Sequence, residues 1–263
     1  MKLADQRRLS RTAVLSGCTT HRRSRVLGIA AAIVSLSGCV PSQGAARSFA
    51  STPSTPRVSS STLVQHSSTT DYRKLEAEIF AELNLARTNP PAYSAVLAEL
   101  VRAFDGKVLH RPGWPFAVLT REGPDATQEA IDALQHQKQL PPLVLDEDLS
   151  RAAFDHAIDQ GRSGALGHTG SDNSSPGDRI SRHGTWTGSW GENIDYGAVI
   201  GGRDVVEDLV VDDGVQSRGH RRNIYDPAAR IVGIGCGPHP TFGVVCVIDQ
   251  ANGFTPRAGS RQN

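Results

Sequence analysis

The chain has 263 residues, with 28 lysines and arginines against 27 aspartates and glutamates. A formal net charge of +1 argues against a protein that binds nucleic acid through bulk positive charge, because such domains are basic overall. Four cysteines are too few for a disulfide-rich scaffold, and no apolar run approaches the roughly 20 residues that a membrane-spanning helix needs. The composition therefore predicts a globular domain without a nucleic-acid partner.

Residues 1–39 have the three parts of a secretory signal peptide. Basic residues dominate the first 25 positions, an apolar stretch covers residues 26–34, and small residues follow it. Residues 36–39 read Leu-Ser-Gly-Cys and resemble the bacterial lipobox, in which the cysteine becomes the acylated first residue of a lipoprotein. We therefore expect lipidation at Cys39 and an extracytoplasmic location, either in the bacterial cell envelope or secreted. The same four letters end at Cys18, but no apolar stretch of useful length precedes them.

Residues 40–70 are predicted to form a disordered linker. They hold nine serines, five threonines and three prolines, and such a segment buries too little apolar surface to offset the entropy of folding. Removal of the first 38 residues would leave 21 basic against 26 acidic residues. The processed protein is therefore expected to be mildly acidic.

Five helices are predicted after the linker, from apolar residues at helical spacing. The first ends where Asn89 precedes two prolines, since the residue before a proline avoids the helical region. The third is expected to open with a capping box of Asp125 and Gln128. The expected ranges are 71–88, 93–104, 125–137, 146–161 and 205–210. The glycine-rich segments 107–123 and 162–203 show no regular periodicity and are predicted to be irregular.

The last predicted element is a β-hairpin. The β-branched runs 231–236 and 244–248 flank a turn-rich segment, and residues 253–263 are expected to be a tail. Cys236 and Cys246 lie on the two predicted strands, so an exported chain would join them in a disulfide. Two buried free thiols are the alternative. A zinc site is less favoured, because the cysteines do not form a CxxC knuckle.

Three polar clusters stand out between the helices and the hairpin. They contain His168, Glu192 and His220, and two imidazoles with a carboxylate are a common ligand set for Zn²⁺. The three residues are 24 and 28 positions apart, so no local motif such as HExxH joins them. On chemistry alone, ordinary structural histidines are the default interpretation.

The order and the flanks of these clusters resemble the CAP superfamily, also called the SCP domain. It includes cysteine-rich secretory proteins, insect venom antigens and plant pathogenesis-related proteins, and the bacterial exported branch fits best. The resemblance covers roughly residues 71–252. The motifs that carry it are Pro142-Leu143, His168, Gly191-Glu192-Asn193-Ile194, Gly219-His220-Arg221-Arg222-Asn223-Ile224 and Val232-Gly233-Ile234-Gly235.

The resemblance implies an α+β fold, a three-layer αβα sandwich around a small antiparallel sheet. It also implies a cleft in which His168 and His220 bind a metal, Zn²⁺ or another divalent ion, beside the acidic Glu192. The family's second acid follows a tryptophan by three positions. Here Leu209 stands in the tryptophan position and Asp212 in the acid position, with Asp213 and Glu207 as rivals for the role.

Three functions are compatible with this sequence. The preferred one is an exported, lipid-anchored binding domain, because the resemblance implies a metal in the cleft, with a lipid or another small hydrophobic molecule as a further expected ligand. The second is a metal-dependent hydrolase with Glu192 as general base, although the chain has neither a GxSxG nor an HExxH motif. The third is a structural or interaction module of the cell envelope. An enzymatic role is the less favoured expectation.

Overall fold

The computed structural model describes residues 13–15, 70–197 and 201–258. The predicted signal peptide, the lipidation site Cys39 and the linker up to residue 69 lie outside the described residues, apart from a three-residue strand near the N-terminus. Among the described helices, none is both long and apolar enough to cross a membrane.

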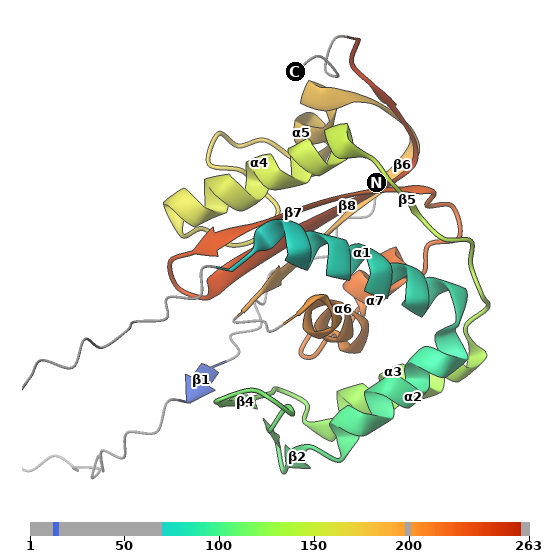
Figure 1. Ribbon diagram of the computed structural model, residues 1–263, viewed down its shortest axis with the longest axis vertical. Helices are drawn as coiled ribbons and strands as arrows, with labels where there is room; N and C mark the ends of the chain where they lie inside the picture. Colours follow the sequence, from blue (N-terminus) through green and yellow to red (C-terminus); the bar gives the residue numbers. More distant parts are fainter. Residues whose placement is uncertain (1–12, 16–69, 198–200, 259–263) are drawn as a thin grey trace, which may run out of the picture. The chain divides into compact units, whose positions relative to one another are not determined.

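A four-stranded sheet forms the central layer (Figure 1). Its strand order is β5-β7-β8-β6. The bounds are Val144–Leu145 for β5, Ile231–His239 for β7, Gly243–Pro256 for β8 and Gly184–Tyr196 for β6. We predicted an antiparallel sheet, but the short β5 runs parallel to β7. The other neighbouring strands are antiparallel.

Helices cover both faces of this sheet, which confirms the predicted αβα sandwich (Figure 1). On one face lie α4 (Glu147–Ser163) and α5 (Pro176–His183). On the other face lie α1 (Tyr72–Thr88), α6 (Gly202–Val211) and α7 (Gly219–Ile224). The larger core lies on the α1 side, and Ala153 and Ala157 of α4 pack against Ile194, Val245 and Val247 on the opposite side.

The segment before β5 adds a helical pair and a small second sheet. Helices α2 (Pro90–Val101) and α3 (Pro124–His136) pack together. The strands are β1 (Ala13–Leu15), β2 (Phe104–Asp105), β3 (Val108–Leu109) and β4 (Ala117–Leu119), in the order β1-β4-β3-β2. The expected irregular loop over 107–123 therefore contains two short strands. The expected capping box is also wrong, because α3 begins after Gly123 and the side chain of Gln128 bonds to Asp132 instead.

Several helix boundaries are set by side-chain caps. The carboxylate of Asp71 accepts from the backbone of Lys74 at the start of α1. Asn89 ends α1 and accepts from the backbone of Ala92 at the start of α2. The carboxylate of Asp146 accepts from the backbone N–H groups of Asp148 and Leu149 at the start of α4.

Glycines let α4 lie close on the hairpin. A Cβ atom at Gly233 or Gly235 would collide with the backbone of α4, and one at Gly161 would collide with the carbonyl of Pro238. We expected α4 to end at Gly161, and this prediction is wrong. The helix continues to Ser163 and ends at Gly164, whose φ of 68° is left-handed.

The largest difference from prediction is the segment 162–203. It contains α5 and the 13-residue strand β6, which pairs with β8 on one side and forms the edge of the described sheet. Strand β8 also runs to Pro256, because its last residues pair with the beginning of β6. The expected tail over 253–263 therefore starts four residues too early. The polar and glycine-rich composition of β6 does not show the pattern of a strand, because side chains of β6 belong to the site described below.

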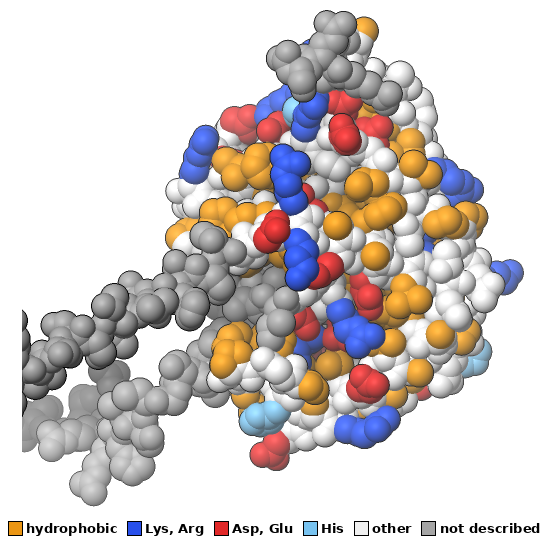
Figure 2. Space-filling view, in the orientation of Figure 1, with side chains coloured by type: hydrophobic (Ala, Val, Ile, Leu, Met, Phe, Trp, Pro, Cys, Tyr) orange, Lys and Arg blue, Asp and Glu red, His pale blue; other side chains and the backbone are white. Residues whose placement is uncertain are grey.

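The hairpin of β7 and β8 contains the predicted disulfide. Cys236 and Cys246 are directly opposed in the register and bonded, with their Cα atoms 4.2 Å apart. Both cysteines are buried. On the molecular surface, basic and acidic side chains lie interspersed on the face shown in Figure 2, as the near-neutral charge balance of the sequence suggests.

Candidate functional site

The carboxylate of Glu192, on β6, is held from two sides. Its Oε1 atom lies 2.7 Å from Nδ1 of His168, and Nη2 of Arg179 donates to its Oε2 atom at 2.6 Å. Glu192 and Arg179 are each only 2% exposed. Of the residues expected in the cleft, His168 and Glu192 are therefore brought together, with an arginine that the sequence reasoning missed.

Arg179 also fixes the loop that presents His168. It lies on α5, whose first turn is closed by a capping box of Ser175 and Asp178. Its Nη1 atom donates to the carbonyl oxygens of His168 and Ser174, at 3.1 and 3.0 Å. The signal in the sequence was this capping box, which marks a helix inside the segment expected to be irregular.

A second acid, Asp249, lies opposite Glu192 on β8. Burial raises the pKa of Asp249 well above its usual range, and the negative charge of Glu192 raises it further. Burial also acts to raise the pKa of Glu192, but the hydrogen bond from His168 and the charge of Arg179 outweigh it, so this pKa is lowered. Burial therefore favours the neutral form of Asp249 beside an ionised Glu192, and neither carboxylate oxygen of Asp249 has a hydrogen-bond partner among the described residues. Asp249 stands in an apolar run, and nothing in the sequence marked it.

His220 and Asp212, two further residues of the expected cleft, form a second contact. Nδ1 of His220 lies 2.7 Å from Oδ1 of Asp212, and the backbone N–H of His220 donates to Oδ2 at 2.9 Å. Asp212 ends α6 in the left-handed conformation, with φ of 58°, which turns its side chain back toward the first turn of α7. The rivals have other partners: Asp213 accepts from the backbone of Arg121 and Glu122, and Glu207 accepts from Arg111.

Strand β6 connects the two pairs. Successive strand residues point to opposite faces, so Glu192 faces Arg179 while Asn193 faces α7. Asn193 donates to the carbonyl of His220 at 3.1 Å, and Asn223 donates to the side chain of Asn193 at 2.8 Å. A Cβ atom at Gly191 would lie 3.2 Å from Cγ of Asn223, which explains a glycine at this position. The Gly-Glu-Asn and Gly-His-Arg-x-Asn motifs therefore form one contact.

The two histidines partly fit a metal-binding role. An imidazole that donates its Nδ1–H to a carboxylate keeps the lone pair of Nε2 for a metal, and carboxylate–histidine pairs commonly orient metal ligands in this way. Nε2 of His168 is buried and has no partner among the described residues. Those residues contain no group of three or more His, Cys, Asp or Glu side chains placed to hold an ion. The unpartnered Nε2 of His168 fits one imidazole ligand of an ion, and the described residues do not assemble a closed four-ligand zinc site around it.

Tyr196 supports the His168 loop from β6. Its hydroxyl accepts from the backbone N–H of Gly167 at 2.8 Å and donates to the side chain of Gln160 at 3.1 Å. The carbonyl of Gly167 in turn lies 2.9 Å from Nε2 of the fully buried His156. His156 is therefore a supporting core residue behind the candidate site.

A family comparison agrees with the motifs. The family model of the cysteine-rich secretory protein family, CAP, matches residues 119–249. An extracellular SCP-domain protein from Bacillus anthracis is 20% identical, with a TM-score of 0.35, over 48% of this chain and 38% of that protein. An outer surface protein from Borrelia burgdorferi is 18% identical, with a TM-score of 0.37, over 45% of this chain and 80% of that protein. The match thus spans little more than a third of the Bacillus protein. No curated protein matches the sequence.

With its ordered motifs and its αβα sandwich, the chain belongs to the cysteine-rich secretory protein (CAP) family.

Proposed function

We propose that this chain is an exported binding protein in which His168 and His220 hold a divalent metal ion, Zn²⁺ in the first instance. The observation that supports this most is the buried, unpartnered Nε2 atom of His168, in an imidazole oriented by Glu192. A buried polar atom of this kind is usually completed by a ligand or by water.

Export is the second part of the proposal. The disulfide between Cys236 and Cys246 supports it, because such bonds persist in oxidising compartments and are rare in the cytosol. The basic and apolar N-terminal segments and the lipobox that ends at Cys39 support an envelope lipoprotein. A lipid or another small hydrophobic ligand in the cleft belongs to the same proposal and rests on the family resemblance alone.

The hydrolase alternative is disfavoured by the geometry of Glu192. A general base needs a free carboxylate oxygen within reach of the water that it activates. Here His168 contacts one oxygen and Arg179 the other. Glu192 is thus better placed to orient His168 than to accept a proton from water.

Isothermal titration calorimetry of the full chain with ZnCl₂, after dialysis against a chelator, tests the metal site. We expect saturable binding that weakens at least about tenfold in His168→Ala and in His220→Ala, since each variant removes one proposed ligand. His136→Ala, on the exposed end of α3, is the matched control and should bind like the wild type. Unchanged zinc binding by the double His168→Ala, His220→Ala variant would reject the site.

A further inference from the structure

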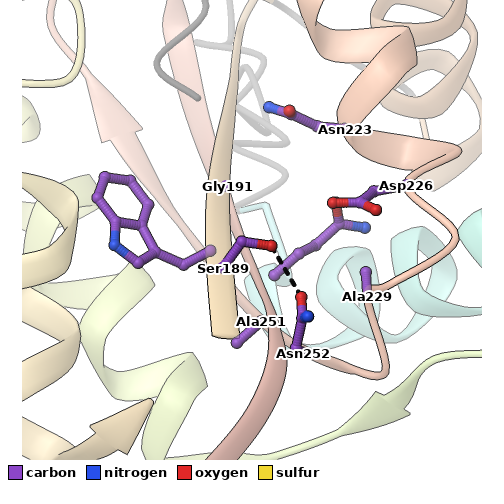
Figure 3. A pocket seen from close by; sticks show the side chains of 9 residues that line it. Ser189, Gly191, Asn223, Asp226, Ala229, Ala251 and Asn252 are labelled. Atoms are coloured by element: carbon purple, nitrogen blue, oxygen red, sulfur yellow. Dashed lines mark hydrogen bonds between the residues drawn. The ribbon is translucent and has the colours of Figure 1, made fainter. Parts of the chain in front are cut away.

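A small polar cavity lies between the β6–β8 edge of the sheet and the loop that follows α7 (Figure 3). Its volume is about 70 Å³. In Figure 3, Asn223 and Asp226 approach from α7 and the following loop, and Ser189 and Asn252 approach from the strands. Gln250 also lines the cavity. Gly191 belongs to this wall while the side chain of its neighbour Glu192 faces Arg179, so the cavity lies on the other face of β6 from the Glu192–His168 contact, and neither histidine lines it.

The wall of this cavity is held by a buried arginine. Arg87, on α1, is fully buried and donates to the carbonyl oxygens of Ile224, Asp226 and Ala229, at 2.5, 3.2 and 3.3 Å. On the other wall, the hydroxyl of Ser189 donates to the side chain of Asn252 at 2.9 Å. The loop after α7 and the strands are thus fixed by hydrogen bonds, which makes the cavity a preformed feature.

Gln250 brings an unsatisfied donor to the cavity. The residue is 3% exposed, and its Nε2 atom has no hydrogen-bond partner among the described residues. Leaving such a buried donor unpaired is unfavourable. Across the cavity, Asp226 uses one carboxylate oxygen to accept from the backbone of Ala228 at 2.8 Å. The cavity therefore offers both a donor and an acceptor.

These groups define the chemistry of an occupant. No lysine, arginine or histidine side chain belongs to the described lining, which disfavours phosphate and carboxylate ligands. An ammonium group would match Asp226 but only donates, so Gln250 would stay unpaired. A hydroxyl group both donates and accepts. Because a water needs about 10–15 Å³ in the same measure, this cavity holds a few heavy atoms rather than a whole sugar ring.

We propose that this cavity is a binding subsite for a neutral sugar, taking two adjacent hydroxyl groups at one edge of the ring. Asp226 accepts from one hydroxyl and Gln250 donates to it or to its neighbour. Asn223, Asn252 and Ser189 supply further amide and hydroxyl partners. The subsite is distinct from the metal site proposed above and does not depend on it.

Saturation-transfer-difference NMR on the full chain tests the subsite, with methyl α-D-glucopyranoside and N-acetylglucosamine as probes. Ammonium chloride and sodium phosphate serve as competitors. The test variant Gln250→Met keeps the side-chain length and removes the donor, and Gln128→Met makes the same change on the exposed face of α3. We expect saturation of sugar protons in the wild type and in Gln128→Met, with about tenfold weaker binding in Gln250→Met.

The outcomes separate the alternatives. Absence of saturation transfer to both sugars would overturn the subsite, as would equal sugar binding by Gln250→Met and Gln128→Met. Displacement of the sugar by ammonium at equal concentration would show that the cavity prefers a cation, which also contradicts the proposal. If Gln250→Met does not fold by circular dichroism, Asn252→Ala at the half-buried rim carries the same expected loss.

Discussion

Four acidic side chains share one buried arginine near the end of β6. Arg111 contacts Asp204, Glu207 and Asp208, and its charge also acts on Asp195. One guanidinium cannot neutralise four carboxylates. Burial, together with the charges of Asp208 and Asp204, accordingly raises the pKa of Glu207 to about 7, although Arg111 opposes the shift. The pKa of Asp195 is raised well above its usual range by burial and then by Asp208.

This cluster predicts a loss of stability as pH rises. The pKa of Glu207 is higher in the folded protein than in the unfolded chain, so its contribution is fully present below about pH 4.5 and is lost as pH rises through about 7. For Glu207 the loss is at most about 3 kcal/mol. Urea unfolding at several pH values between about 5 and 8 should show the decline in the wild type and a flatter profile in Glu207→Gln.

Glu99→Gln, on the exposed face of α2, is the control for this experiment and should keep the slope of the wild type. Parallel profiles for the wild type and Glu207→Gln would mean that Glu207 is ionised in the folded protein at all these pH values.

The residues that sequence reasoning found and missed differ in kind. His168, Glu192 and His220 were identified because ordered motifs surround them, and Asp212 by its position three residues after Leu209. In the structure His168 lies against Glu192, and His220 lies against Asp212. Asp249 and Gln250 were missed because they stand in an apolar strand, where a polar residue shows no pattern. Their partners come from other elements, and only the fold brings these together. Side-chain environments of this kind cannot be derived from periodicity.

At the level of elements, prediction depended on how much of an element is buried. Helices α1, α4 and α6 and the β7–β8 hairpin were predicted because one face of each helix and both strands of the hairpin are apolar. Strand β6 was not, since it lies at the edge of the described sheet and its polar side chains contact Arg179, α7 and the cavity. A strand devoted to a site lacks the alternation that would reveal it.

The disulfide of the hairpin is expected to contribute measurably to stability. The two cysteines are ten positions apart, and closing a loop of that length should contribute about 2–3 kcal/mol through the unfolded chain. Guanidinium unfolding of the Cys236→Ser, Cys246→Ser double variant should show this loss as a lower denaturation midpoint. Reduction of the wild type should reproduce it, and an unchanged midpoint in both samples would contradict the expectation.

At the scale of the whole molecule, the αβα sandwich begins at α1 and extends beyond the segment that the family model matches. The helices α1 and α2 lie outside the range matched by the family model, yet Leu75, Ile79 and Leu97 belong to the same core as the hairpin. The folded unit is therefore larger than the matched segment.

Membrane attachment is the prediction that belongs to this scale. If Cys39 is acylated in the bacterial envelope, the wild-type protein should partition into the detergent phase of a Triton X-114 extraction. Cys39→Ala should move to the aqueous phase, because it lacks the acyl chains. Cys18→Ala, which changes the second Leu-Ser-Gly-Cys segment, should partition like the wild type. Equal partitioning of all three proteins would rule out the anchor at Cys39.

The left-handed residue Asp212 has a consequence for how this site can evolve. It ends α6, accepts from the backbone of α7 and orients His220. The same residue is therefore needed for the fold and for the site. Only glycine, asparagine and aspartate adopt this backbone readily, and among them only aspartate accepts from the imidazole and the backbone N–H with a negative charge. Replacement of Asp212 by glutamate during evolution would therefore require a different backbone conformation in the connection between α6 and α7.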